Sequence, residues 1–408
     1  MKRFLRGIGI AWSIVGLTLL MLVLINQLLV WTLPAPAEAE QIVPGAEAPD
    51  NSVADAYAEA HWVKDYWAEH GRSRTTDWHS YVYWRRAPFS GELVNVDAHG
   101  FRGGWNNADA DAQAPQIWVF GGSLVWGTGV PDAFTLPSQL AFLYAKKDQE
   151  RQVRVLNFGQ SGYVSGQSRI AFAQALACAQ QKPELVIFVD GPNDVYAAFQ
   201  ADRAGAPQNE HRRATEFNSS QRPGALLGAW FNRLDGVEHL RAWGAEPAQL
   251  ASVSDLAAAV VQKYLAYVEQ SRALAAAEGI PSVFVWQPHL FAKQALSNDE
   301  QLIVNASYVR HRELQLAADQ ALSAAPPSSA QIVDLANLFA DEPKARFSDF
   351  VHIDDQGLET LARAIFEQLP PRPEVEEGTE HIQAQLPAQP ASSAPSACVD
   401  LPVVDVTE

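Results

Sequence analysis

Five short, continuous apolar runs separated by helical patterns constrain the fold of this chain more than any other feature. Such runs are typical of strands buried on both faces of a parallel sheet. They lie at Ile117–Phe120, Val153–Leu156, Leu185–Val189, Val283–Trp286 and Ile332–Leu335. Helical patterns come between or after them, at about 136–145, 166–180, 256–278 and 356–368. Strands that alternate with helices predict an α/β fold, with a doubly wound parallel sheet covered on both faces.

The first 33 residues predict one N-terminal transmembrane helix. A basic start, MKRFLR, precedes an apolar stretch from about Ile8 to Leu33. Roughly 20 apolar residues suffice to span a bilayer. Basic residues stay on the cytoplasmic side, so we expect a single-pass protein of the inner membrane with its main domain in the periplasm or outside. The alternative is a signal peptide cleaved near Ala35-Pro36-Ala37, although its apolar region would ordinarily be only about 7–15 residues long.

Composition divides the rest of the chain. Residues 34–55 are rich in Pro, Ala and Glu and predict a stalk. The main domain is expected at 56–370, beginning with an aromatic-rich segment, 56–114, that covers the sheet domain or, alternatively, forms a carbohydrate-stacking surface. The alternation of strand and helix patterns is absent at 197–250, which predicts an insertion that could act as a substrate lid. The Pro-, Glu-, Ala- and Ser-rich tail, 371–408, is expected to be disordered.

Charge and cysteine content exclude several classes of protein. The formal net charge is −17 and no basic stripe stands out, which argues against nucleic acid as a partner because phosphate binding requires clustered cations. The two cysteines, Cys178 and Cys398, predict no structural disulfide, because Cys398 lies in the tail. The sequence has no H-E-x-x-H or H-x-H pair, so we expect no metal site.

Four short segments contain polar residues at the expected edge of the sheet. FGGSLVWGTG contains Ser123, NFGQSG ends at Gly162, DGPND contains Asn193, and SDFVHIDDQG contains Asp349 and His352. The first three follow an apolar run directly, and the last precedes the final helical pattern. Because parallel strands end at a common edge, we expect these residues to lie close together.

The residue types suit acyl transfer through a serine ester. Ser123 is the expected nucleophile, His352 the general base, and Asp349 the acid that orients the imidazole. The backbone N–H groups of Ser123 and Gly162 and the side-chain amide of Asn193 are the expected oxyanion donors. Taken singly, each segment also fits an ordinary turn, a loop glycine or a surface Asp and His.

In this order, over about 115–369, the segments resemble blocks I, II, III and V of the SGNH/GDSL hydrolase superfamily. The resemblance implies a flavodoxin-like three-layer α/β/α fold and ester hydrolysis by a serine nucleophile, without metal or other cofactor. It assigns the nucleophile to Ser123, the acid and base to Asp349 and His352, and the glycine and asparagine of the oxyanion hole to Gly162 and Asn193.

One position departs from the family. Its Gly-Asp-Ser reads Gly-Gly-Ser here, with Gly122 in place of the aspartate, so support for this loop must come from elsewhere. The HGFRGG segment upstream of Ser123 looks like that of a bacterial, membrane-anchored subset of SGNH proteins.

The resemblance and the anchor together predict a membrane-anchored serine esterase that acts on an O-acyl ester. The expected substrate is an O-acetyl group on an envelope polysaccharide. One alternative is an O-acyltransferase, in which a sugar hydroxyl replaces water. An alternative of another class is a non-catalytic envelope binding or scaffolding protein that keeps the fold. Protein partners cannot be read from the sequence.

Overall fold

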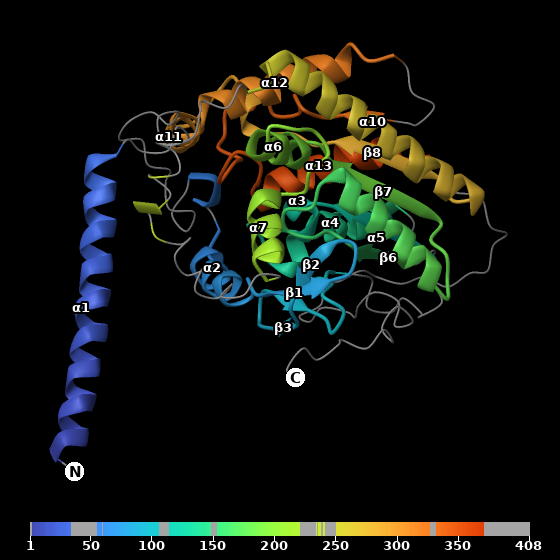
Figure 1. Cartoon of the computed structure of the whole chain (residues 1–408). Helices are drawn as coiled ribbons and strands as arrows, with labels where there is room; N and C mark the ends of the chain where they lie inside the picture. The colour runs from blue at the N-terminus through green and yellow to red at the C-terminus, as the bar shows by residue number, and fades with distance from the viewer. Residues whose placement is uncertain are drawn as a thin grey trace. The chain divides into compact units, whose positions relative to one another are not determined.

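The computed structural model describes residues 2–33, 55–58, 60–105, 114–147, 153–220, 234, 236–237, 240, 250–326 and 332–370 (Figure 1). The chain divides into two compact units. One comprises Met1–Pro44 and Asn209–Leu250, and the other Gly45–Gln208 and Ala251–Glu408. The expected tail, and the expected stalk except for Asp55, lie outside the described residues.

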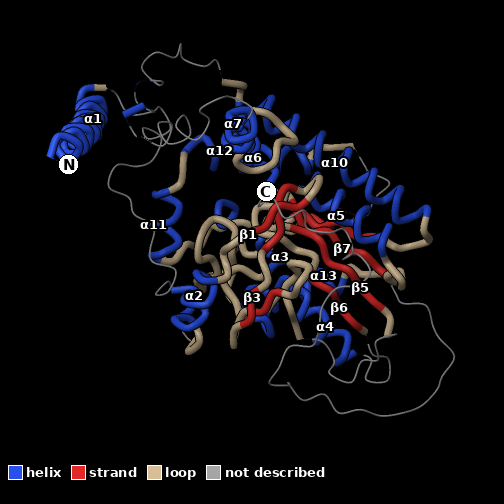
Figure 2. Tube along the Cα trace, turned by 60° about the horizontal axis from the view of Figure 1, so that its bottom comes forward, coloured by secondary structure: helices blue, strands red, loops and turns tan. Residues whose placement is uncertain are grey.

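The second unit is built on a five-stranded parallel sheet, drawn in red in Figure 2. Its strands are β5 (Gln116–Gly121), β6 (Arg154–Asn157), β7 (Leu185–Asp190), β8 (Ser282–Trp286) and β9 (Ile332–Asp334). They lie in the order β6-β5-β7-β8-β9, which is the flavodoxin-like order 2-1-3-4-5. Each strand matches a predicted apolar run to within one residue at either end, so the α/β prediction with a parallel sheet is confirmed.

Helices cover both faces of this sheet. One face packs against α4 (Leu136–Lys147) and α13 (Asp355–Glu367), together with α2 (Val63–Arg72), the short α3 (Ser123–Trp126) and α11 (Asn298–Ala306). The other packs against α5 (Ser165–Cys178), α6 (Pro192–Ala201), α10 (Val253–Ala277) and α12 (Val309–Ser323). Short 3-10 helices lie at Asp55–Tyr57, Asp132–Phe134 and Leu290–Ala292. The result is the three-layer α/β/α architecture that the resemblance implied.

The two faces of the sheet differ in side-chain type because residues alternate along each strand. The α4–α13 face is largely aliphatic, as at Ile117 and Val119. The α5–α10 face is aromatic. There Phe158, Phe120, Phe188 and Phe284 stack in a row, with successive ring centroids 4.6, 5.3 and 5.0 Å apart. Because the last three are register partners, the row ties three neighbouring strands together.

The aromatic-rich segment supplies α2 and two small antiparallel hairpins. These pair β1 (Thr76–His79) with β2 (Tyr83–Arg86), and β3 (Phe89–Ser90) with β4 (Asn95–Val96). Tyr66 and Trp84 are among the aromatic side chains that it buries in the core, whereas Trp78 and Tyr81 are 71% and 78% exposed.

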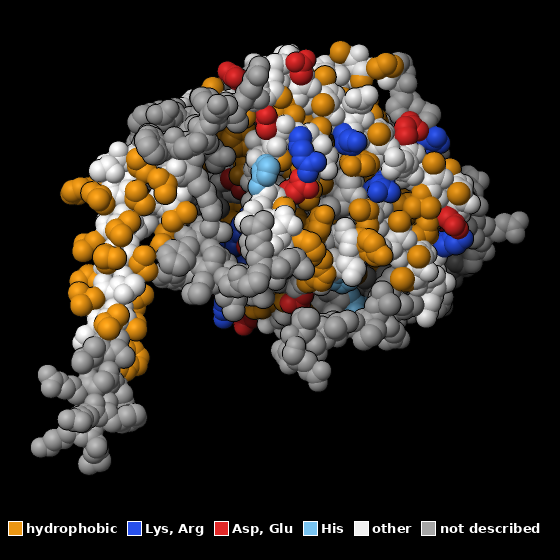
Figure 3. Space-filling model, in the orientation of Figure 1, with side chains coloured by type: hydrophobic (Ala, Val, Ile, Leu, Met, Phe, Trp, Pro, Cys, Tyr) orange, Lys and Arg blue, Asp and Glu red, His pale blue; other side chains and the backbone are white. Residues whose placement is uncertain are grey.

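The first unit contains α1 (Lys2–Thr32) and α7 (Glu210–Ser220). Trp12–Thr32 of α1 has a mean hydropathy of 2.3 and is long enough to cross a membrane. Figure 3 shows hydrophobic side chains around this helix. The hydroxyls of Thr18 and Thr32 donate to carbonyls one turn earlier, so they are satisfied within the helix. A membrane anchor and a signal sequence both have these properties.

The start of the segment expected as an insertion, 197–250, is helical. Helix α6 continues to Ala201 and packs against α12, and residues up to Gln208 belong to the second unit. Of the segment predicted as an insertion, only 209–250 groups with the first unit.

Candidate active site

Ser123 is the first residue of α3, directly after β5, at the carboxyl edge of the sheet. It is 8% exposed. Gly122 before it has no space for a side chain, because a Cβ there would lie 2.2 Å from Asn193 Nδ2 and 3.2 Å from the Tyr163 carbonyl oxygen.

His352 and Asp349 lie next to Ser123. His352 Nε2 is 2.6 Å from Ser123 Oγ, and His352 Nδ1 is 2.5 Å from Asp349 Oδ2. The structure therefore brings together the three residues predicted to form the triad. With Asp349 on Nδ1, the neutral imidazole keeps its proton there and offers Nε2 to the hydroxyl as an acceptor.

The loop that contains Asp349 and His352 is held by contacts within the loop itself. Phe347 and Ile353 form an antiparallel bridge, and Asp349 Oδ1 accepts the backbone N–H groups of Val351 and His352, each at 2.8 Å. Burial alone would raise the pKa of Asp349, but His352 and the hydrogen bonds that the carboxylate accepts hold its pKa below the usual value. The acid is therefore ionised at neutral pH.

The predicted oxyanion donors Asn193 and Gly162 lie near Ser123 and Gln208, respectively. Asn193 lies in the first turn of α6, and its Nδ2 sits beside Gly122 and donates to the Tyr163 carbonyl at 2.8 Å. Gly162 has φ +77°, a left-handed conformation that favours glycine. Among the described residues, no acceptor takes its backbone N–H. The Asn193 amide thus lies beside the residue that precedes Ser123.

Strand β2 holds the Gly162 loop, a role that the sequence did not reveal. Arg86 Nη2 donates to Ser161 Oγ at 2.8 Å, and the Arg86 N–H donates to Gln160 Oε1 at 3.0 Å. Trp84 Nε1 donates to the Ser161 carbonyl at 2.8 Å, and its own carbonyl accepts the Tyr163 hydroxyl at 2.6 Å. Nothing in the spacing of these residues distinguishes them from ordinary strand residues.

The arginine of HGFRGG holds the loop after Ser123. Arg102 Nε pairs with Asp132 at 2.7 Å, its Nη2 donates to the Val130 carbonyl at 2.7 Å, and its Nη1 donates to the Gly127 carbonyl. Arg102 therefore closes the turn in which α3 ends.

A buried ion pair fastens the loop of Asp349 and His352. Lys293 Nζ lies 2.6 Å from Glu300 Oε2, and both side chains are fully buried. The other oxygen, Glu300 Oε1, accepts the N–H groups of Arg346 and Phe347 at 2.9 and 3.2 Å. Sequence reasoning missed this pair because charged residues are usually exposed.

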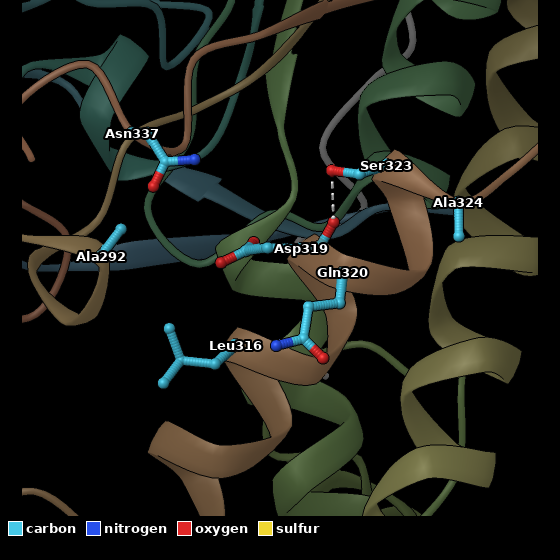
Figure 4. A pocket seen from close by; sticks show the side chains of 7 residues that line it. All are labelled: Ala292, Leu316, Asp319, Gln320, Ser323, Ala324 and Asn337. Carbon is cyan, nitrogen blue, oxygen red and sulfur yellow. Dashed lines mark hydrogen bonds between the residues drawn. The ribbon is translucent and has the colours of Figure 1, made fainter.

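A second His–Asp pair lies outside the site. His289 is buried, and its Nε2 lies 2.8 Å from Asp319 Oδ2. Asp319 also lines a pocket of about 490 Å³ on α12, which contains neither Ser123 nor His352 (Figure 4). In the described part of the chain, no group of three or more His, Cys, Asp or Glu side chains is arranged to hold a metal ion.

No family model and no curated protein matches the chain. Similar solved structures include the acetyl xylan esterase AlAXEase, with 12% identity, a TM-score of 0.34, and coverage of 62% of this chain and 100% of that one. A member of the lipolytic G-D-S-L family from Veillonella parvula has 15% identity and a TM-score of 0.33, with coverages of 62% and 97%. A lipase/acylhydrolase from Enterococcus faecalis has 16% identity and a TM-score of 0.35, with coverages of 62% and 94%. This chain has a three-layer α/β/α fold with the flavodoxin-like strand order, and the four sequence blocks that resemble those of the SGNH/GDSL superfamily meet at one edge of its sheet.

Proposed function

We propose that the chain is a membrane-anchored serine esterase of the SGNH type. The observation that carries the proposal is the continuous contact from Ser123 Oγ through the His352 ring to Asp349, at 2.6 and 2.5 Å. A serine hydroxyl becomes a useful nucleophile when an adjacent base takes its proton. The contact between Ser123 and His352 is within the roughly 2.6–3.2 Å reach of a nucleophile and its base, and the contact between His352 and Asp349 is short.

In the proposed reaction, Ser123 Oγ attacks the ester carbonyl while His352 Nε2 takes the hydroxyl proton. The charge that develops on the carbonyl oxygen is stabilised by the N–H groups of Ser123 and Gly162 and by the Asn193 amide. The C–O bond of the ester then breaks, and His352 returns the proton to the leaving alcohol. Water, activated by the same histidine, hydrolyses the acyl-serine and releases the acid. Asp349 stabilises the charged imidazole in each half-reaction.

The proposed substrate is an O-acetyl group on an envelope polysaccharide. Two features support it: the family resemblance of the four blocks, and an N-terminal helix able to anchor the domain at the inner membrane. To test it, purified full-length chain in detergent is incubated with an O-acetylated polysaccharide. Wild-type chain should release acetate, and Ser123→Ala should not. Acetyl transfer to an added sugar acceptor, with no free acetate, would assign the chain to the O-acyltransferases instead.

The proposed anchor is tested separately by alkaline carbonate extraction of membranes. Full-length chain should remain in the pellet, with the main domain accessible to protease from the periplasmic side. A soluble product that starts near Glu38 would show that the segment is a cleaved signal peptide.

A further inference from the structure

Gln208 lies beside two of the proposed oxyanion donors, although it belongs to none of the four sequence blocks. It is half-buried, in the loop that follows α6. Its Nε2 donates to Asn193 Oδ1 at 3.1 Å. Its Oε1 stands 3.0 Å from the point that a Cβ on Gly162 would occupy. One side chain therefore adjoins both Asn193 and Gly162.

The orientation of the Asn193 amide depends on contacts of opposite type. An asparagine can donate to an oxyanion only through Nδ2, because Oδ1 is an acceptor. Nδ2 meets the carbonyl oxygen of Tyr163 at 2.8 Å, and Oδ1 meets the donor of Gln208. If the amide were flipped, Oδ1 would face the Tyr163 oxygen and Nδ2 would face the Gln208 NH₂ group. Both contacts would then become repulsive.

On the basis of the proposed function, we propose that Gln208 is a positioning residue of the oxyanion hole. It holds Asn193 in the donating orientation and, as a neutral amide, brings no negative charge to the place where the oxyanion forms. Its bond to Oδ1 also polarises the Asn193 amide, which makes Nδ2 a better donor. Gln208 takes no part in bond making. Because it acts through a contact that strengthens in the transition state, it should affect kcat rather than KM.

Two substitutions distinguish the loss of the Gln208 donor from the addition of a negative charge at the same position. Gln208→Met removes the donor without adding charge. Gln208→Glu also removes the donor, because an ionised carboxylate only accepts, and it places a negative charge beside the oxyanion. Removal of a whole oxyanion donor costs roughly 10²–10³ in kcat. A residue that orients a donor should cost less, so we expect a loss of roughly 10-fold for Gln208→Met and about 10²-fold for Gln208→Glu.

The experiment measures kcat and KM of the full-length chain in detergent with p-nitrophenyl acetate from pH 5 to 8. KM should stay within about twofold of wild type for both variants, because uniform binding is not altered. The ratio of kcat for Gln208→Glu to that of wild type should rise as the pH falls and the new carboxylate is protonated. For Gln208→Met the ratio should not change with pH.

Gln301 provides a matched control. Its Nε2 donates to Asn305 Oδ1 at the same distance, 3.1 Å, on the exposed face of α11. Gln301→Glu should keep the wild-type kcat at every pH. Wild-type kcat in both Gln208 variants, or a loss confined to KM, would overturn the proposal. If Gln208→Glu does not fold, as judged by thermal unfolding, Gln208→Met decides alone. Absence of turnover by wild-type chain would overturn the proposed function itself, and the role of Gln208 with it.

Discussion

Ser123 Oγ lies 2.6 Å from His352 Nε2, although 229 residues separate the two in the chain. Different elements position the two residues. Ser123 lies in the turn between β5 and α3, and His352 lies in the bridged loop that precedes α13. The turn with Ser123 and the loop with His352 both lie at the carboxyl edge of one parallel sheet, so the order of the strands makes the contact possible.

Loss of either member of this contact should abolish ester turnover. Ser123→Ala and His352→Ala are each expected to lower kcat by roughly 10⁴–10⁶-fold, because the residues of a triad act as a unit. Thermal unfolding should remain close to that of wild type, and Ser323→Ala on the exposed end of α12 should keep full activity. Wild-type rates in Ser123→Ala would require a different nucleophile.

Removal of the Asn193 amide should slow the reaction without weakening substrate binding. Asn193→Ala is expected to lower kcat by about 10²–10³-fold, the usual cost of one oxyanion donor. KM should change little, because the bond strengthens only as charge develops on the oxygen. Steady-state kinetics with p-nitrophenyl acetate checks this. A variant with a raised KM and an unchanged kcat would assign Asn193 to substrate binding instead.

The sequence predicts the sheet better than the surroundings of the site, for a physical reason. A buried parallel strand needs a continuous apolar run, and that requirement is visible locally, as at Leu185–Val189. The burial of Lys293 depends instead on Glu300 and on backbone groups near Arg346, which only the fold brings close. The same holds for Gln208, which looks like any polar loop residue until Asn193 lies beside it. Helices α11 and α12 were missed because polar and charged residues interrupt their apolar pattern.

Separation of the buried pair should destabilise the loop that carries His352. Lys293→Met leaves the Glu300 charge buried without its partner, which should cost about 3–5 kcal/mol of unfolding free energy. Arg363→Met, which breaks the exposed Arg363–Glu359 pair on α13, is the matched control and should cost no more than about 0.5 kcal/mol. Urea denaturation of the full-length chain measures both. Equal losses of unfolding free energy in Lys293→Met and Arg363→Met would show that the buried pair contributes no more to stability than an exposed one.

Acid should destabilise the fold already below about pH 6.5. Burial, with a smaller effect of nearby His289, lowers the pKa of His311 from 6.5 to about 3. Between these values the unfolded chain binds a proton that the folded chain does not, so stability falls as the pH falls, by about 1.4 kcal/mol per pH unit for one group. His311→Leu should reduce the slope of unfolding free energy between pH 4 and 6 by that amount. Parallel pH profiles of the variant and wild type would contradict the lowered pKa.

The most direct test of Ser123 as the nucleophile is to label the full-length chain with a fluorophosphonate, which reacts with an activated serine, and to map the adduct by mass spectrometry. One adduct is expected, on Ser123, and it should form slowly or not at all in His352→Ala, because the histidine must take the hydroxyl proton. Ser165, which is also buried but donates to the carboxylate of Asp194, should stay unmodified. An adduct on another serine, or an unlabelled Ser123 in a folded chain that still hydrolyses esters, would contradict this role of Ser123.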